Sequence, residues 1–160
     1  MNGPEIDKAF YEALDNEDDL GVVIRAHIHV ESTIIKFINE RLTDLKSLGK
    51  LRYSQRVELA CELGLNVEMK KPLKILGEIR NSFAHKINAQ LNQQNIDQFF
   101  ESFDIKSRSL FQSGYETSGS DMLKSNQRFS NLNFKDKFVI MVVVLKARAE
   151  FELYRLKVNL

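Results

Sequence analysis

The stretch FVIMVVVL, Phe138 to Leu145, decides between a helical and a mixed fold for this chain of 160 residues. Its β-branched side chains alone are typical of a buried strand. Within residues 134–157, however, Phe151 and Leu156 continue the apolar spacing. A segment of this length favours a long helix. Because a membrane span needs roughly 20 apolar residues, more than twice this run, we expect no contact with a membrane.

The rest of the chain shows mainly helical patterns. Apolar side chains recur at helical spacing over residues 18–42, and the acidic residues 1–17 predict a short first helix. Helix ends are expected where prolines, a glycine and polar cap residues occur, namely at Pro4, Ser54, Gly64, Pro72 and Asn95. These marks predict three more helices, over residues 54–63, 68–87 and 95–103.

Residues 112–133 are rich in Ser, Gly and Asn and show no clear period, so they predict a flexible loop. No alternating strand pattern and no internal repeat occur. The sequence therefore predicts one all-α domain over residues 1–160, a bundle of about five to six helices. We expect two or three long antiparallel helices as its frame.

Charge and cysteine content limit the possible classes of protein. The net charge is only +1, but residues 1–20 carry −6 and residues 46–86 carry +5, so the middle of the chain is suited to attract phosphate. Ordinary solvated helix faces with scattered surface lysines also explain this excess, and on charge alone that explanation is favoured. The lone Cys61 and the absence of a secretion-signal pattern predict a cytoplasmic protein.

Motifs for cofactor and metal chemistry are absent from the sequence. There is no glycine-rich phosphate loop, no Cys/His cluster with zinc spacing and no G-x-S-x-G. We therefore expect neither a cofactor nor a bound metal ion.

Two charged residues occupy unusual helical positions. Projection at 100° per residue puts Glu31 and His27 within the apolar stripe of residues 24–42, and it puts Arg80 at the margin of the next stripe. A buried carboxylate requires a partner, so we predict an ion pair between Glu31 and Arg80. This pair is either purely structural or part of a site, whereas His27 is expected to be a core histidine. Asn81 and His85 share the opposite, polar side, where a solvated histidine is the simplest interpretation.

The segment RNSFAH, residues 80–85, resembles the R-x4-6-H motif of the HEPN superfamily. The resemblance implies a small all-α protein, often a homodimer, and many such proteins are metal-independent endoribonucleases. Some are toxins or defence proteins, with a cognate antitoxin as partner. The order of helices is most similar to the mannitol operon repressor family, whose members are regarded as transcriptional regulators acting through protein contacts.

The chemistry of RNA cleavage fits the residue types of this motif. A histidine can move protons near neutral pH, and an arginine can stabilise charge on the phosphate. One chain offers one placed histidine, so a second subunit must supply another. The leading hypothesis is an RNA-cleaving homodimer with Arg80, His85, Asn81 and Glu31 as site residues. The alternatives are a non-catalytic regulator with a regulatory protein partner, and a nucleic-acid-binding module that uses residues 46–86.

Overall fold

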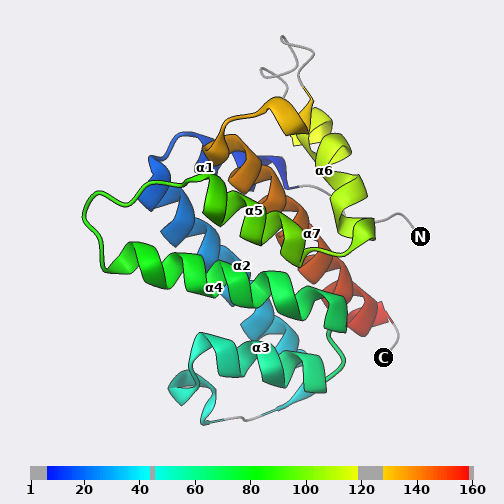
Figure 1. The fold of residues 1–160 in the computed structure, drawn as a ribbon. Coiled ribbons are helices and arrows are strands. Elements are labelled where there is room, and N and C mark those ends of the chain that lie inside the picture. The colour runs from blue at the N-terminus through cyan, green and yellow to red at the C-terminus, as the bar shows by residue number, and fades with distance from the viewer. Residues whose placement is uncertain (1–6, 44–45, 119–127, 159–160) are drawn as a thin grey trace.

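The computed structural model describes residues 7–43, 46–118 and 128–158, and in these ranges the chain is helical without strands (Figure 1). The predicted all-α bundle is therefore confirmed, with seven α-helices in the described residues instead of about five to six. The helices are α1 (Lys8–Asp15), α2 (Asp19–Arg41), α3 (Tyr53–Glu62), α4 (Lys70–Ala84), α5 (Gln93–Ser102), α6 (Ile105–Ser118) and α7 (Phe134–Val158), with the short 3-10 helices η1 (Leu48–Lys50), η2 (Val67–Met69) and η4 (Phe129–Asn131).

Helix α7 forms the centre of the bundle. Every residue from Phe138 to Leu145 is buried, because α7 packs against α1, α2, α5 and α6. A helix that is covered on all sides has no polar face, which explains why its sequence shows no one-sided pattern. No helix in the described ranges is long and apolar enough to cross a membrane.

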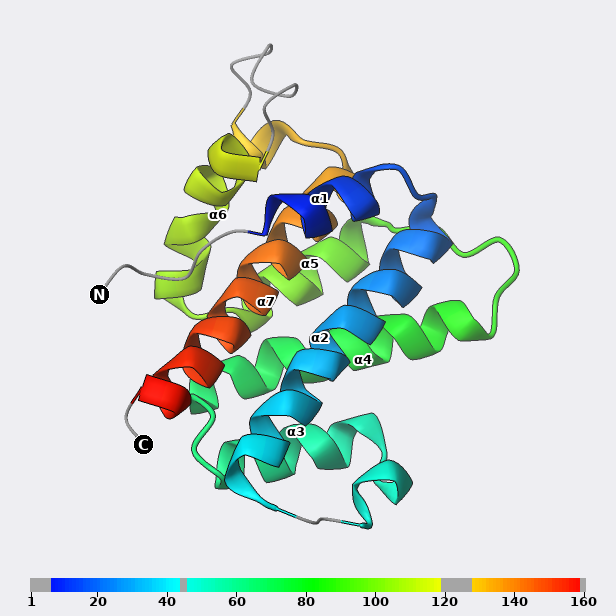
Figure 2. The same ribbon diagram turned by 180° about the vertical axis from the view of Figure 1, so that it is seen from behind.

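Helices α2 and α7 lie side by side and run in the same direction (Figure 2). At one end, the Lys135 ammonium donates to the backbone oxygens of Asp15 and Glu17, both at 2.8 Å. At the other end, Lys157 pairs with Glu40 at 3.2 Å. The prediction of an antiparallel frame is therefore wrong for this pair. Helices α4 and α5 lie on one face of the pair and α1 on the other (Figures 1 and 2).

The structure corrects the predicted loop over residues 112–133. Helix α6 continues to Ser118, η4 spans Phe129–Asn131, and residues 119–127 lie outside the described residues. The glycine and serines that suggested a loop include Gly114, where an added Cβ would lie 3.1 Å from Val144 of α7. Gly114 is thus a point of close helix approach, and Phe111 and Tyr115 on the same helix are buried.

Several helix ends and faces also differ from prediction. Helix α4 ends at Ala84, three residues before its predicted end, and Ile87 is 94% exposed. On α2, Ile28 is 58% exposed although it belongs to the apolar spacing of residues 18–42. The N-cap residue of α5 is Asn92, which exchanges hydrogen bonds with the predicted cap residue Asn95. The N-cap residue of α3 is Arg52 and not Ser54. The first described helix, α1, covers only residues 8–15 of the predicted 1–17, and residues 1–6 lie outside the description.

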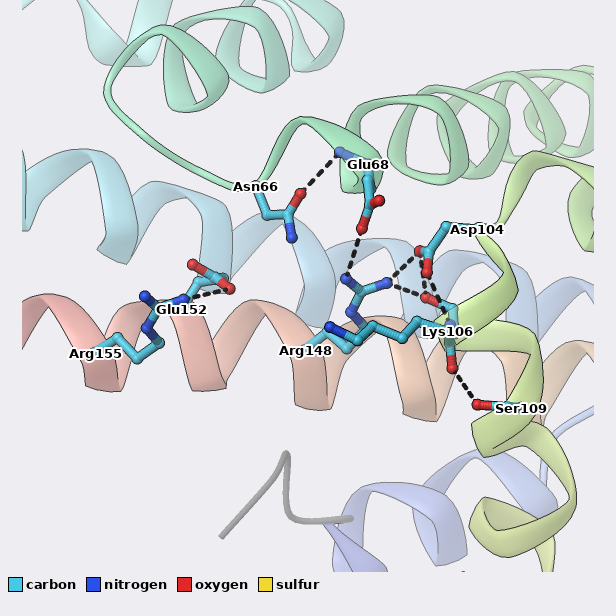
Figure 3. A network of polar contacts seen from close by, with 9 residues as sticks. Asn66, Glu68, Asp104, Lys106, Ser109, Arg148, Glu152 and Arg155 are labelled. Atoms are coloured by element: carbon cyan, nitrogen blue, oxygen red, sulfur yellow. Dashed lines mark hydrogen bonds and ion pairs between the residues drawn. The ribbon is translucent and has the colours of Figure 1, made fainter. Parts of the chain in front are cut away.

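A network around Arg148 joins three parts of the chain (Figure 3). Its guanidinium donates to Asp104, which precedes α6, and to Ser107, and it lies 3.6 Å from Glu68 of η2. The Arg148 side chain is 13% exposed and that of Asp104 is 16% exposed. Burial alone would raise the pKa of Asp104, but hydrogen bonds from Ser107 and Arg148 outweigh it and lower the pKa. Arg148 therefore fixes α6 and η2 to the central helix.

We expect Arg148→Ala to lower the free energy of unfolding by about 2 to 4 kcal/mol, because it leaves a largely buried carboxylate without its cation. Chemical denaturation measures this change. Arg155→Ala is the matched control: Arg155 lies on the same helix, is 50% exposed and pairs only loosely with Glu152 at 3.6 Å. Its removal should change stability by less than about 0.5 kcal/mol. Equal losses in both variants would contradict the anchoring role of Arg148.

Candidate functional site

A cavity of about 650 Å³ lies among α2, the start of α3 and α4. It brings together three of the four predicted site residues. Glu31, Arg80 and Asn81 line it, whereas His85 does not. Three further lining residues are important for its shape and charge, namely His27 of α2 and Tyr53 and Arg56 of α3.

The partner of Glu31 is Arg56. The Nη1 atom of Arg56 donates to Glu31 Oε1 at 2.7 Å, and the Arg56 side chain is only 15% exposed. Its Nε atom also donates to the Leu48 carbonyl oxygen at 3.3 Å. The sequence correctly indicated that Glu31 needs a cation, but the predicted pair with Arg80 is wrong. Arg56 comes instead from α3, which packs against α2 on this side.

Arg80 and Asn81 form an exposed pair at the cavity. The Arg80 Nη1 atom donates to Asn81 Oδ1 at 3.0 Å, and both residues are exposed. This contact leaves further guanidinium donors of Arg80 and the amide donors of Asn81 available to a ligand. The two neighbouring residues therefore supply a positive charge and several hydrogen-bond donors at one position.

His85 follows the last residue of α4. It is exposed and occupies the C-cap position with φ −106° and ψ 5°. His85 thus lies at the C-terminal end of α4, the helix that carries Arg80 and Asn81, and unlike those two residues it does not line the cavity.

His27 is a buried polar residue of the cavity wall. Its side chain is 6% exposed, and its ring centroid lies 4.3 Å from that of Tyr53 in a tilted contact. Burial, together with the nearby charge of Arg80, lowers the pKa of His27 to about 4. His27 is therefore neutral at physiological pH, as expected for a core histidine, but it also faces the cavity.

The Tyr53 ring is held between α3 and α4. Its hydroxyl donates to the Leu73 backbone oxygen at 2.9 Å, and burial raises the pKa of its phenol, helped by the charge of Glu31. The ring lies directly on Gly77, where an added Cβ would be 2.7 Å from Tyr53 Cδ1. Glycine at this position thus allows α4 to approach the ring and fixes one wall of the cavity.

The charges that line the cavity are predominantly positive. The lining contains four cations, Arg52, Arg56, Lys74 and Arg80, and two carboxylates, Glu31 and Glu78. Glu78 also accepts a hydrogen bond from Gln98 at 3.3 Å. Lys74 and Lys70 both pair with Glu58, and the hydrogen bond from Lys70 is the main cause of the lowered pKa of Glu58. The site is thus suited to an anionic ligand.

Carboxylates and histidines are too scattered for a metal centre in this part of the chain. Among residues 7–43, 46–118 and 128–158, no three His, Cys, Asp or Glu side chains gather closely enough to hold a metal ion. His29, two residues after the cavity residue His27, is exposed and contacts Phe10 with ring centroids 4.9 Å apart.

Comparison of the chain with models of known protein families, curated proteins and solved structures found no match. The resemblance of residues 80–85 to the HEPN motif therefore stays a prediction.

Sequence reasoning missed Tyr53, Arg56 and Gly77 as parts of the site. Arg56 was recognisable only as one of several cations in the basic middle region, and nothing in the sequence distinguished it from Arg52. Gly77 offered the clearest signal, because a glycine within a helical pattern costs stability and often marks a close approach.

We expect Gly77→Ala to lower the free energy of unfolding by about 1 to 3 kcal/mol, because the added methyl group must displace the Tyr53 ring. Thermal or chemical denaturation measures the loss. Gly49→Ala is the control, since an added Cβ at Gly49 meets no atom within 4 Å. If both variants were as stable as the wild-type protein, the tight contact between Gly77 and Tyr53 would be refuted.

The neutral state of His27 predicts a pH-dependent loss of stability. Its pKa is about 4 in the folded protein and about 6.5 in the unfolded chain. Below pH 6.5 the unfolded chain therefore binds a proton that the folded protein does not, and stability falls with pH. We expect this group to contribute a loss of about 2 kcal/mol between pH 7 and pH 5.

Denaturation of the wild-type protein and His27→Gln at pH 7, 6 and 5 measures this contribution. The variant lacks the titrating group, so its stability should decrease less over the same range. Parallel curves for the two proteins would show that His27 is not held neutral by burial.

Proposed function

We propose that this chain is a metal-independent endoribonuclease of the HEPN type that acts as a homodimer. The observation that carries the proposal is the exposed, hydrogen-bonded pair of Arg80 and Asn81 at a positively charged cavity, with His85 exposed just beyond the end of the same helix. These residue types suit an RNA phosphate: the guanidinium binds the anionic oxygens, and the imidazole transfers protons.

The reaction requires two proton transfers and stabilisation of charge. A base removes the proton of the RNA 2′-hydroxyl, whose oxygen attacks the adjacent phosphorus atom. An acid protonates the departing 5′-oxygen, so the products carry a 2′,3′-cyclic phosphate and a 5′-hydroxyl. Arg80 stabilises the additional negative charge of the phosphorane, while Asn81 orients the guanidinium. Glu31 supports the site through Arg56.

A homodimer supplies the second proton-transfer group. One chain presents a single His85, and two-fold symmetry would bring a second copy of the same helix end to a shared cleft. A toxin or defence role, with a cognate antitoxin as partner and the cytoplasm as its place of action, belongs to the same proposal.

We expect the purified protein to cleave single-stranded RNA in the presence of EDTA and to leave 2′,3′-cyclic phosphate ends. His85→Ala should reduce the rate by about 100-fold or more, because a general acid or base is removed. Lys86→Ala, which removes the neighbouring exposed cation, is the matched control and should remain active. Gel analysis of end-labelled RNA measures all three proteins, and light scattering shows whether they are dimers.

The absence of cleavage by the wild-type protein, or an unchanged rate in His85→Ala, would refute the proposal. That result would favour a regulator of the mannitol operon repressor type. One observation supports this second candidate: Val67 and Ile105 are 70% and 84% exposed, and their neighbours Glu68 and Asp104 both contact Arg148. Two exposed apolar side chains in one region are typical of a protein-contact surface.

A further inference from the structure

The inner wall of the cavity presents polar atoms that other parts of the described chain leave unsatisfied. No hydrogen bond within the described residues reaches either ring nitrogen of His27. The nearest charged atom is Glu31 Oε2, 3.8 Å from His27 Nδ1, which is too far for a hydrogen bond. Glu31 uses Oε1 for Arg56, so Oε2 remains an available acceptor. Buried polar groups are normally hydrogen-bonded, and His27, at 6% exposure, therefore indicates a missing partner.

The outer part of the cavity presents cations without a strong partner. Arg52 makes no ion pair in the described part of the chain, and Arg80 makes only its contact with Asn81. By contrast, Arg56 is neutralised by Glu31 and Lys74 by Glu58. The uncompensated positive charge thus lies at the exposed residues Arg52 and Arg80, and the inner wall offers neutral or accepting groups.

The dimensions of the cavity exceed those needed for a phosphate alone. Its volume of about 650 Å³ lies within the usual range for sites that bind small organic molecules. A suitable ligand therefore combines an anionic group at the mouth with a planar or polar group that donates hydrogen bonds inside. A single nucleotide has this arrangement.

We infer that the cavity binds one unpaired nucleotide of an RNA, with its phosphate on Arg52 and Arg80 and its base edge on Glu31 Oε2 and His27. Among the four bases, guanine fits best, because its Watson–Crick edge places two N–H groups side by side and the inner wall offers a carboxylate oxygen and an imidazole nitrogen as acceptors. Sequence-specific proteins commonly read unpaired RNA bases by such contacts. This inference rests on the proposed ribonuclease function and assigns its substrate preference.

Titration of the 160-residue protein with 5′-GMP, 5′-UMP and inorganic phosphate, monitored by calorimetry or NMR, tests the assignment without requiring catalysis. We expect 5′-GMP to bind at least about tenfold more tightly than 5′-UMP, as is usual for discrimination by paired hydrogen bonds to a base. Glu31→Gln should abolish this preference. Arg52→Ala removes an exposed side chain that makes no ion pair within the described residues, and it should weaken the binding of both nucleotides about tenfold or more.

Two control variants separate the inference from the proposed function. Lys71→Ala removes an exposed cation of α4 that does not line the cavity, and it should bind 5′-GMP like the wild-type protein. His85→Ala should lose cleavage but retain 5′-GMP binding, because His85 lies outside the cavity.

The remaining outcomes separate the base-binding assignment from the ribonuclease proposal. Equal binding of 5′-GMP, 5′-UMP and phosphate, or no binding at all, would overturn the base-binding assignment even if the protein cleaves RNA through His85. Selective 5′-GMP binding that depends on Arg52 and Glu31, in a protein that does not cleave RNA, would overturn the ribonuclease and leave the cavity as a nucleotide site.

Discussion

The burial of residues 138–145 of α7 on every side is the constraint on which the other helices depend. Residues 138–145 expose almost no surface, and covering such a helix requires neighbours around its whole circumference. Helices α1, α2, α5 and α6 provide this cover. The parallel arrangement of α2 and α7 is compatible with the long connection between them, since the intervening chain contains the other helices that complete the bundle. Even Lys146, 6% exposed, is accommodated there, through ion pairs with Asp7 and Glu150.

Much of the helical architecture was predictable from the sequence, because most segments carry their own periodicity and end signals. Gly64, for example, ends the α3 region with a φ of 107°, which favours glycine. Helix α6 was not predicted because Gly114 and the serines around it resemble loop residues, although the glycine serves close packing against Val144. The direction of α7 relative to α2 was also not predictable, because periodicity identifies a buried face without specifying the neighbour that covers it.

The candidate site shows the same division between local and non-local information. The position of Glu31 in an apolar pattern was enough to indicate a buried cation partner, and Arg56 fulfils that requirement. The choice between Arg56 and Arg80 depended on which helix covers this part of α2. A helical projection contains no such information. Likewise, Arg80 and Asn81 were recognised from a short motif, whereas the wall formed by Tyr53 against Gly77 exists only because α3 and α4 pack together.

The order of charges through the cavity explains how a polar site can exist beside this core. Inside, Glu31 and Arg56 neutralise one another, and His27 carries no charge because burial lowers its pKa to about 4. An isolated charge at that depth would be strongly unfavourable. The unbalanced cations Arg52 and Arg80 lie instead at exposed positions, where water solvates them until a ligand arrives. A charged group of a ligand therefore gains most at the mouth, whereas an uncharged donor gains most inside. The stability requirements of the protein and the polarity of the proposed nucleotide ligand thus follow the same gradient from core to surface.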